Sequence, residues 1–118
     1  IVVPQAPSLT WNLGHTAGTV MLRMPLHPVA IELLRETGPL AVSSANVSGQ
    51  PPAQNAAEAK AQLGEAVAVY LESGGADIGT ASTIVDLTHG TPRIVREGAI
   101  TTDRVAEALE VPAQSLQS

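Results

Sequence analysis

The sequence predicts an α/β or α+β domain with a twisted, mixed β-sheet flanked by helices. Short apolar runs rich in β-branched residues alternate with segments of helical periodicity. Ten glycines and nine prolines indicate many turns between short elements. Around His89-Gly90-Thr91 two such runs follow each other closely enough to form an antiparallel hairpin, so both types of strand pairing are expected in one sheet.

The composition limits the size and the core of this domain. With 118 residues the chain forms one domain or less. Its hydrophobic content is 44%, but it has one Trp, one Tyr and no Phe, so the core must consist of Val, Leu, Ile and Ala. There is no cysteine, which excludes disulfides and thiolate zinc sites within the chain.

The charge and the hydropathy limit the partners. A net charge of −5 with only six Lys plus Arg argues against a long track of phosphate contacts. One compact phosphate site with one or two arginines is still compatible with this charge. No apolar run is long enough to span a membrane, and the start is not signal-like, so we expect a cytoplasmic protein without a membrane partner.

The first half of the chain is expected to begin with a strand end over residues 1–3 and a loop over 4–17. In the next strand, over 18–25, alternation turns Val20, Leu22 and Met24 toward the core. Helix 27–37 has Pro28 in its first turn and Gly38 at its end. Its apolar stripe consists of Val29 with Leu33 and Ala30 with Leu34.

A buried strand over 40–43 precedes a second helix over 55–63. Asn55 is placed to cap this helix, Glu58 lies three residues later as in a capping box, and Gly64 ends it. A strand over 67–71 and a turn over 72–77 follow.

The last third is expected to contain a hairpin and a helix. A strand over 82–87 pairs with one over 92–96. In helix 101–109 the stripe is Val105, Ala108 and Leu109. The domain then ends near residue 112, and the polar tail over 113–118 is expected to fray.

Neutral polar residues carry most of the chemical signal. Ser43-Ser44-Ala45-Asn46-Val47-Ser48-Gly49 places three hydroxyls, one amide and one glycine directly after the strand over 40–43. Such a loop can donate several hydrogen bonds to a phosphate or carboxylate. An ordinary Ser/Asn/Gly turn before Pro51-Pro52 explains the same residues.

The titratable residues do not suggest a catalytic or metal site. No nucleophile lies beside a base, and His15, His27 and His89 lack the spacing of metal ligands. Asp86 lies inside an apolar strand, either as a partly exposed position or as a carboxylate bonded to the nearby turn.

Four segments, in order, resemble the YrdC/Sua5 family of L-threonylcarbamoyladenylate synthases. Residues 43–49 look like the family's SAN-x-SG signature, and Gly18-Thr19-Val20 to Arg23-Met24-Pro25 resembles its G-T-V-x-x-R-x-P strand. Residues 82–86 resemble its S-T-(V/I)-(V/I)-D strand, and 94–100 its (I/L)-(L/V)-R-x-G-x-I ending. Residues 1–112 would then be the C-terminal portion, roughly half, of a YrdC-like domain.

This resemblance implies an enzyme that uses ATP with Mg²⁺, bicarbonate and L-threonine. It would form threonylcarbamoyl-AMP and pyrophosphate, and a separate threonylcarbamoyl transferase complex would use the product for t6A modification of ANN-decoding tRNAs. A non-catalytic nucleotide- or RNA-binding module of the same fold is the alternative. The acidic balance and the scarcity of aromatic residues count against RNA.

The resemblance also assigns roles to residues. Thr19, Ser44 and Arg96 would bind the nucleotide. Arg23, the Val42 backbone and Ser82 would bind L-threonine, and the planar guanidinium of Arg23 suits a carboxylate. Loop-shaping roles fall to Asn46, Ser48 and Gly49.

The family's basic N-terminal motifs, which hold the triphosphate, have no counterpart in this sequence. Only Arg23, Arg93 and Arg96 are expected near the site. We therefore expect the fragment alone to be inactive. Half a sheet leaves open edges, so we also expect either an N-terminal half beyond this chain or a homo-oligomer that covers the exposed surface.

Overall fold

A computed structural model describes residues 1–75 and 80–117 of the chain. The chain divides into two compact units. Residues 1–24 and 80–118 form the first, called the sheet unit, and residues 25–79 form the second, called the helical unit. Within the described residues, no helix is long and apolar enough to cross a membrane.

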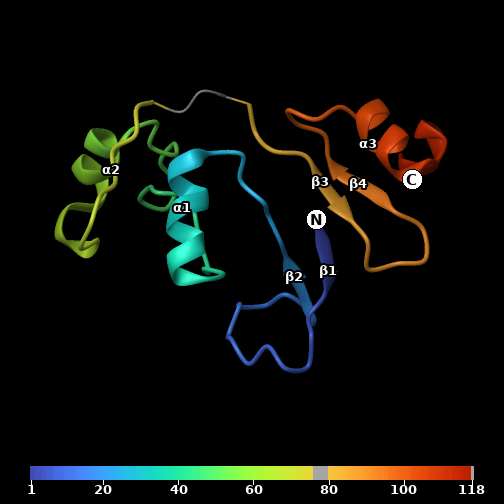
Figure 1. The fold of residues 1–118 in the computed structure, drawn as a ribbon, viewed down its shortest axis with the longest axis horizontal. Coiled ribbons are helices and arrows are strands. Elements are labelled where there is room, and N and C mark those ends of the chain that lie inside the picture. Colours follow the sequence, from blue (N-terminus) through green and yellow to red (C-terminus); the bar gives the residue numbers. More distant parts are fainter. Residues whose placement is uncertain (76–79, 118) are drawn as a thin grey trace. The chain divides into compact units, whose positions relative to one another are not determined.

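The sheet unit contains a mixed four-stranded sheet in the order β2-β1-β3-β4 (Figure 1). Its strands are β1 (Val2–Pro4), β2 (Thr19–Met21), β3 (Ile84–Asp86) and β4 (Arg93–Arg96). β1 pairs antiparallel with β2 and parallel with β3, and β3 pairs antiparallel with β4. The predicted mixed sheet and the predicted hairpin are both confirmed.

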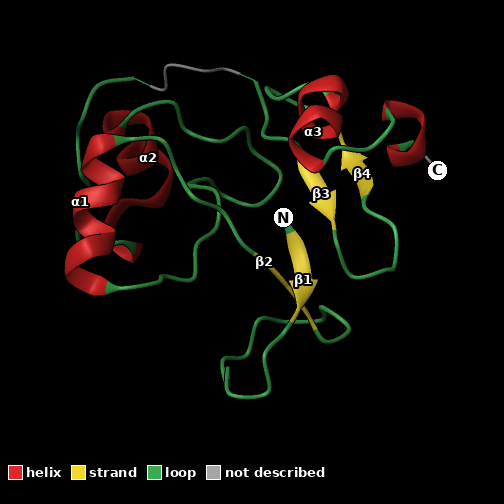
Figure 2. Cartoon of the chain, turned by 45° about the vertical axis from the view of Figure 1, so that its right-hand side comes forward, coloured by secondary structure: helices red, strands yellow, loops and turns green. Residues whose placement is uncertain are grey.

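The core of this unit lies between the hairpin and the C-terminal segment. α3 (Thr102–Leu109) is followed by a 3₁₀ turn, η2 (Ala113–Leu116), which contacts α3 and β4 (Figure 2). Leu116 has an exposed fraction of 0%, the lowest of the described apolar residues. The expectation that the tail frays is therefore wrong for residues 113–116, because one leucine anchors them.

The prediction for α3 is correct in position and wrong in its buried face. Thr101 caps the helix by accepting the Arg104 N–H at 3.4 Å. The buried line is Thr102 and Ala106, one turn apart, whereas Ala108 and Leu109 are exposed. Val105 is half-buried, so it alone of the predicted stripe is on the covered side.

The strand around Thr19 is shorter than predicted, and its apolar face is not buried beyond Val20. β2 ends at Met21, and Leu22 and Met24 are exposed. Leu22 still donates its N–H to Ile1 O at 2.8 Å, so the ladder with β1 ends there. The expectation that Leu22 and Met24 face the core is therefore wrong for the described structure, and Val20 alone of the three is half-buried.

The helical unit contains α1 (Pro28–Thr37), α2 (Ala56–Leu63) and the 3₁₀ turn η1 (Gly64–Ala66). Both helices end where the sequence predicts and begin one residue later than predicted. In α1, Pro28 lies in the first turn and the Gly38 N–H donates to Leu34 O at 2.8 Å. No residue of α1 is buried, and Val29 and Leu33 of the predicted stripe are exposed.

The predicted N-cap of α2 is confirmed, and the return bond of the predicted capping box is shifted by one residue. Asn55 Oδ1 accepts the Glu58 N–H at 2.9 Å. Glu58 Oε2 in return accepts the N–H of Gln54, the residue before the cap, at 2.8 Å. An N-cap of this kind is worth about 1 kcal/mol. Ala59 is the buried residue of this helix.

Two predicted strands are absent from the helical unit as described. Residues 40–43 and 67–71 pair with no strand among the described residues. Val42, expected to be buried, has an exposed fraction of 83%. A strand needs a ladder partner, and none is present here for either run. The predicted turn over 72–77 lies partly outside the described residues; within it, Glu72 Oε1 accepts the Gly74 N–H at 2.9 Å.

Candidate functional site

Three of the predicted ligand residues lie at one end of the sheet. Because β2 and β4 run opposite to β1 and β3, the carboxyl ends of the first pair meet the amino ends of the second (Figure 1). Arg23 follows β2, Arg96 ends β4, and Ser82 precedes β3. The topology thus brings two arginines and one serine to the same end of the sheet.

Arg96 and Ser82 are in direct contact. Arg96 donates from Nε and Nη2 to Ser82 O, at 3.1 and 2.8 Å, and from Nη2 to Ser82 Oγ at 3.4 Å. These bonds use the Nε and Nη2 edge of the guanidinium. The N–H groups of Nη1 have no partner among the described residues, and the residue is exposed, so they can donate to a ligand.

A β-bulge in the hairpin determines which way Arg96 faces. Val85 pairs with Ile94, but Ile84 pairs with Arg96, so Val95 is an extra residue on β4. Opposed residues share a face of the sheet, so the bulge moves Arg96 away from the face of Ile94 and the buried Val85. Without the extra residue, Ile94 and Arg96 would lie on one face.

Arg23 and Thr19 differ in their surroundings. The Arg23 side chain is exposed and takes part in no ion pair or hydrogen bond among residues 1–75 and 80–117. Thr19 pairs with Pro4 at the opposite end of β2, and its hydroxyl donates to Thr16 O at 2.7 Å. Thr19 and Arg96, both assigned to the nucleotide, therefore lie at opposite ends of the sheet.

Arg93 does not join the other two arginines, contrary to expectation. It begins β4, at the hairpin end, and its Nη2 lies 3.6 Å from Asp86 Oδ2. Asp86 is buried and accepts the Thr88 N–H and hydroxyl at 2.8 and 2.6 Å. Of the two alternatives for Asp86, the structure selects the carboxylate bonded to the nearby turn.

Hydrogen bonds hold Asp86 in its ionised form. The Thr88 hydroxyl, then the Thr88 N–H, lower the pKa of the Asp86 carboxyl from its ordinary value of 3.8, with smaller contributions from His89 and Arg93. Partial burial opposes them. The arrangement closes the hairpin turn and leaves this carboxylate no proton to exchange at neutral pH, which suits a structural role.

The loop over residues 43–49 lies in the helical unit. Its backbone is held by Gln62, which accepts the Val47 N–H at 2.8 Å and donates to Pro51 O at 3.0 Å. Gln50 N–H donates to Val47 O at 2.9 Å, and Gly49 has a φ of 85°, in the left-handed region that glycine occupies without strain. Asn46 Nδ2 donates to Val47 O at 2.9 Å.

The polar side chains of this loop keep unused hydrogen-bonding capacity. Ser44 and Ser48 are exposed, and their hydroxyls have no partner within the described parts of the chain. Asn46 Oδ1 is enclosed and also lacks a partner there. The loop can therefore donate hydrogen bonds to a ligand, but its predicted partners Arg23, Ser82 and Arg96 belong to the other unit.

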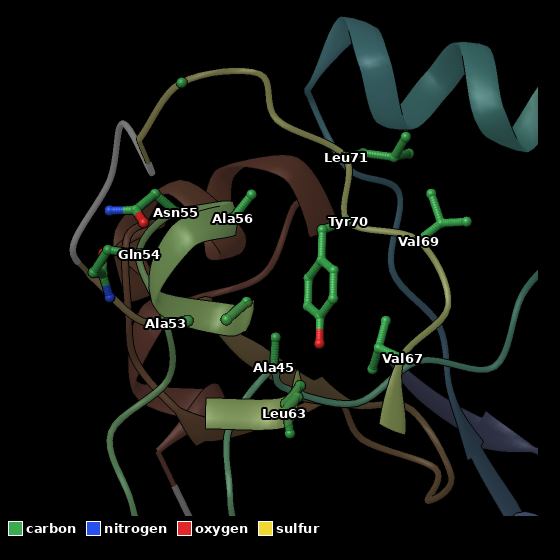
Figure 3. Close-up of a pocket in the computed structure, with 12 residues that line it drawn as sticks. Ala45, Ala53, Gln54, Asn55, Ala56, Leu63, Val67, Val69, Tyr70 and Leu71 are labelled. Atoms are coloured by element: carbon green, nitrogen blue, oxygen red, sulfur yellow. The ribbon is translucent and has the colours of Figure 1, made fainter. Parts of the chain in front are cut away.

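Two pockets in the structure are not lined by the predicted ligand-binding residues. An open hollow of about 330 Å³ in the helical unit is lined mainly by small and aliphatic side chains, with Tyr70 among them (Figure 3). The Tyr70 hydroxyl donates to Gly64 O at 2.6 Å. Ala45 is its only lining residue from the loop. A second hollow, of about 320 Å³, lies at the hairpin turn beside His89 and Arg93.

Two residues that the sequence interpretation left without a role shape this end of the sheet. The Thr83 hydroxyl accepts the N–H groups of Gly98 and Ile100, at 3.0 and 3.1 Å. At Gly98 a side chain is impossible without rearrangement, because an added Cβ would lie 2.1 Å from Ala81 O. Both residues fall inside matched motifs, which was the available signal. No cluster of three or more His, Asp or Glu side chains occurs in the part of the chain that the structure describes.

A mixed sheet with two arginines and a serine at one end, in a chain that also carries a serine-rich loop, defines an α/β protein suited to small anionic ligands. A sequence profile named for Sua5, YciO and YrdC and described as "Telomere recombination" matches residues 1–98. The chain therefore belongs to the Sua5/YciO/YrdC family.

Curated relatives carry names of one activity. The chain is 63% identical over 116 residues to a Mycobacterium tuberculosis protein named "Putative threonylcarbamoyl-AMP synthase", covering 98% of this chain and 54% of the relative. A Mycobacterium leprae protein of the same name is 61% identical over 116 residues, which are 98% of this chain and 53% of that relative. The Bacillus subtilis "Threonylcarbamoyl-AMP synthase" is 39% identical over 93 residues, 76% of this chain and 27% of the relative.

The chain spans about half the length of the mycobacterial relatives it matches. No solved structure matches it significantly.

Proposed function

We propose that this chain is part of an L-threonylcarbamoyladenylate synthase. The observation that carries the proposal is the 63% identity, over 98% of the chain, to a relative named for that activity. The relative is nearly twice as long, so the activity is proposed for the intact protein that contains this chain. The chain alone, which lacks the basic motifs expected to hold a triphosphate, is proposed to be inactive.

The proposed reaction needs no covalent enzyme intermediate. The amine of L-threonine combines with bicarbonate to give a carbamate with loss of water. A carbamate oxygen then attacks the α-phosphorus of ATP, and the bond to the bridging oxygen breaks so that pyrophosphate leaves. Positioning and charge neutralisation lower the barrier of such a reaction. This agrees with the described residues of the candidate site, among which no nucleophile lies beside a base.

The arrangement of the sheet unit supports roles for three residues. Arg23 is exposed and has no protein partner among the described residues, so its guanidinium is available to the threonine carboxylate. Ser82 Oγ is proposed to contact the same substrate, and Arg96 Nη1 the nucleotide. Arg96 contacts Ser82 at 2.8–3.4 Å, so the two substrates would meet where these side chains meet.

The remaining proposed roles belong to the serine-rich loop, to Val42 and to Thr19. Ser44 has an available hydroxyl for the nucleotide, and the exposed Val42 can present its backbone to L-threonine. Thr19 is proposed to bind the nucleotide through its hydroxyl oxygen, since the hydroxyl proton is used by Thr16 O. Asn46, Ser48 and Gly49 are proposed to shape the loop.

The proposed setting follows from the reaction. Mg²⁺ is proposed to arrive with ATP, as part of the substrate, since the described residues contain no clustered carboxylates or histidines that would hold it separately. The product would pass to a threonylcarbamoyl transferase complex for t6A modification of tRNA. The absence of cysteine and the tRNA-linked chemistry support a cytoplasmic location.

Pyrophosphate release by the intact protein tests this function. We expect release from ATP only when L-threonine and bicarbonate are both present, with a product of the mass of threonylcarbamoyl-AMP. Arg23→Lys should raise the KM for L-threonine about tenfold or more, because Lys cannot form a bidentate pair with the carboxylate. The matched control is Arg35→Lys on the exposed face of α1, which should leave the KM for L-threonine unchanged. Pyrophosphate release indifferent to threonine, or salt-sensitive RNA binding without any ATP turnover, would contradict the proposal.

A further inference from the structure

The segments on either side of the Arg96–Ser82 contact are tied together by one hydroxyl. Thr83 Oγ1 accepts the Gly98 N–H at 3.0 Å and the Ile100 N–H at 3.1 Å, and its proton is donated to Ile100 O. A hydroxyl has one proton and two lone pairs, so all of its hydrogen-bonding capacity is used. Thr83 therefore has none left for a ligand.

The same two segments also approach each other closely through their backbones. Ala99 N–H donates to Ala81 O at 2.9 Å. Gly98 allows this approach, since any Cβ there would lie 2.6 Å from the Ser82 carbonyl carbon. Residues 81–83 and 98–100 thus form one fixed junction, and Ser82 lies in its middle.

Arg96 depends on this junction for its position. Its guanidinium is held only by the carbonyl and hydroxyl of Ser82 among the described residues. The Ser82 carbonyl belongs to the peptide bond whose nitrogen is that of Thr83, and Arg96 is two residues before Gly98. Movement of either segment would therefore move the acceptor relative to the guanidinium.

We infer that Thr83 is a positioning residue, whose hydroxyl holds Ser82 and Arg96 in the geometry that binds the two substrates. The inference rests on the proposed function for what the site binds. The contact of Thr83 with the Gly98 and Ile100 amides does not depend on the proposed function. The positioning role of Thr83 and the proposed function can therefore be tested separately.

The test uses Thr83→Val and Thr83→Ser in the intact protein. Val has the shape of Thr without the hydroxyl, and Ser keeps the hydroxyl. Thr91→Val is the matched control, because Thr91 is exposed in the hairpin turn and its side chain has no hydrogen bond in the described structure. All four proteins are compared by urea unfolding, by kinetics and by the NMR signal of the Arg96 Nε–H.

The first readout is independent of activity. Hydrogen exchange of the Arg96 Nε–H should be slow in the wild type, in Thr83→Ser and in Thr91→Val. In Thr83→Val it should be about tenfold faster, because the acceptor carbonyl is no longer fixed. Equal exchange in all four proteins would overturn the inference, whatever the enzyme does.

The second readout separates positioning from simple stability. In Thr83→Val we expect the KM for both ATP and L-threonine to rise about tenfold, with Thr83→Ser close to the wild type. A lower kcat with unchanged KM values would mean a smaller folded fraction and would overturn a positioning role. A wild-type protein without threonine-dependent pyrophosphate release would contradict the proposed function instead, and the exchange measurement would then decide the inference alone.

Discussion

Gly98 shows how a single missing atom determines the local structure of the sheet unit. Its φ is not in the left-handed region, so glycine is not required for conformational reasons. It is required by space, since a Cβ would meet backbone atoms of Ala81 and Ser82 that cannot move independently of the sheet. Sequence motifs mark such a glycine, and the structure supplies the reason.

Gly98→Ala should therefore destabilise the protein by about 1–3 kcal/mol, the usual effect of overpacking. Gly90→Ala is the matched control, because Gly90 lies in the turn between β3 and β4, with nothing within 4 Å of an added Cβ and without a left-handed φ. It should be neutral or slightly stabilising. Urea unfolding of both variants measures the difference, and equal midpoints would contradict the predicted clash.

Some residues could not have been predicted from the sequence. Leu116 lies in a polar tail, and one leucine in such a segment carries no periodic signal. Its burial depends on η2 folding back onto α3 and β4. The role of Thr83 depends on amides fifteen and seventeen residues away, which no local pattern encodes. By contrast, the contact of Asn55 with Glu58 is local and was predicted from their spacing.

At the scale of elements, the β3–β4 hairpin owes part of its stability to the ionised Asp86. Its carboxylate accepts two hydrogen bonds from Thr88 and faces Arg93 and His89. The lowered pKa of Asp86 means that the folded state favours the charged form more than the unfolded chain does. This contribution to stability is complete above the ordinary pKa of 3.8 and is lost as the pH falls through the folded-state value.

The pKa of Glu97 is lowered in the same way, from 4.5, by the hydroxyl and then the N–H of Thr102. We therefore expect the free energy of unfolding to be flat near neutral pH and to fall at acid pH. Asp86→Asn should lower the urea midpoint at about pH 7, and this difference from the wild type should shrink toward about pH 3. Glu36→Gln, an exposed site on α1, is the control. A gap between wild type and Asp86→Asn that stays constant with pH would contradict this account.

The elements that sequence predicted correctly are those with local signals. Pro28 and Gly38 bound α1, a capping box starts α2, and the turn over residues 89–91 joins β3 to β4. The strands predicted over 40–43 and 67–71 are right in their apolar character but have no ladder within the described residues. Alternation identifies which residues favour a strand, whereas the strand itself forms only with a neighbour.

At the scale of the whole molecule, the candidate site can be predicted only in part. Topology places Arg23, Ser82 and Arg96 at one end of the sheet, with Arg96 and Ser82 in contact and Arg23 following the opposite edge strand, which motif order alone did not require. The serine-rich loop lies in the helical unit, a compact unit separate from that of the other three residues. Which residues share a motif could be read from the sequence, but which share a surface depends on packing between segments distant in the chain.

The described residues bury few apolar side chains, and this predicts that the chain associates with itself. Only Ala59, Val85, Ala106 and Leu116 are buried apolar residues there, whereas large apolar side chains such as Leu26 and Val42 are exposed at 104% and 83%. Exposed groups of this kind favour association, because covering them removes apolar surface from contact with water. The 118-residue chain on its own should therefore self-associate and bind a hydrophobic dye.

Light scattering after gel filtration measures this association. Leu26→Glu and Val42→Glu together should shift the chain toward the monomer and lower the dye fluorescence. Gln50→Glu combined with Gln54→Glu is the matched control: it adds the same charge at exposed polar positions and should leave the association unchanged. A wild-type chain that elutes as a monomer without binding dye would show that the exposed apolar residues cover one another in solution. If the control also becomes monomeric, the loss of association is due to the added negative charge and not to the removal of Leu26 and Val42.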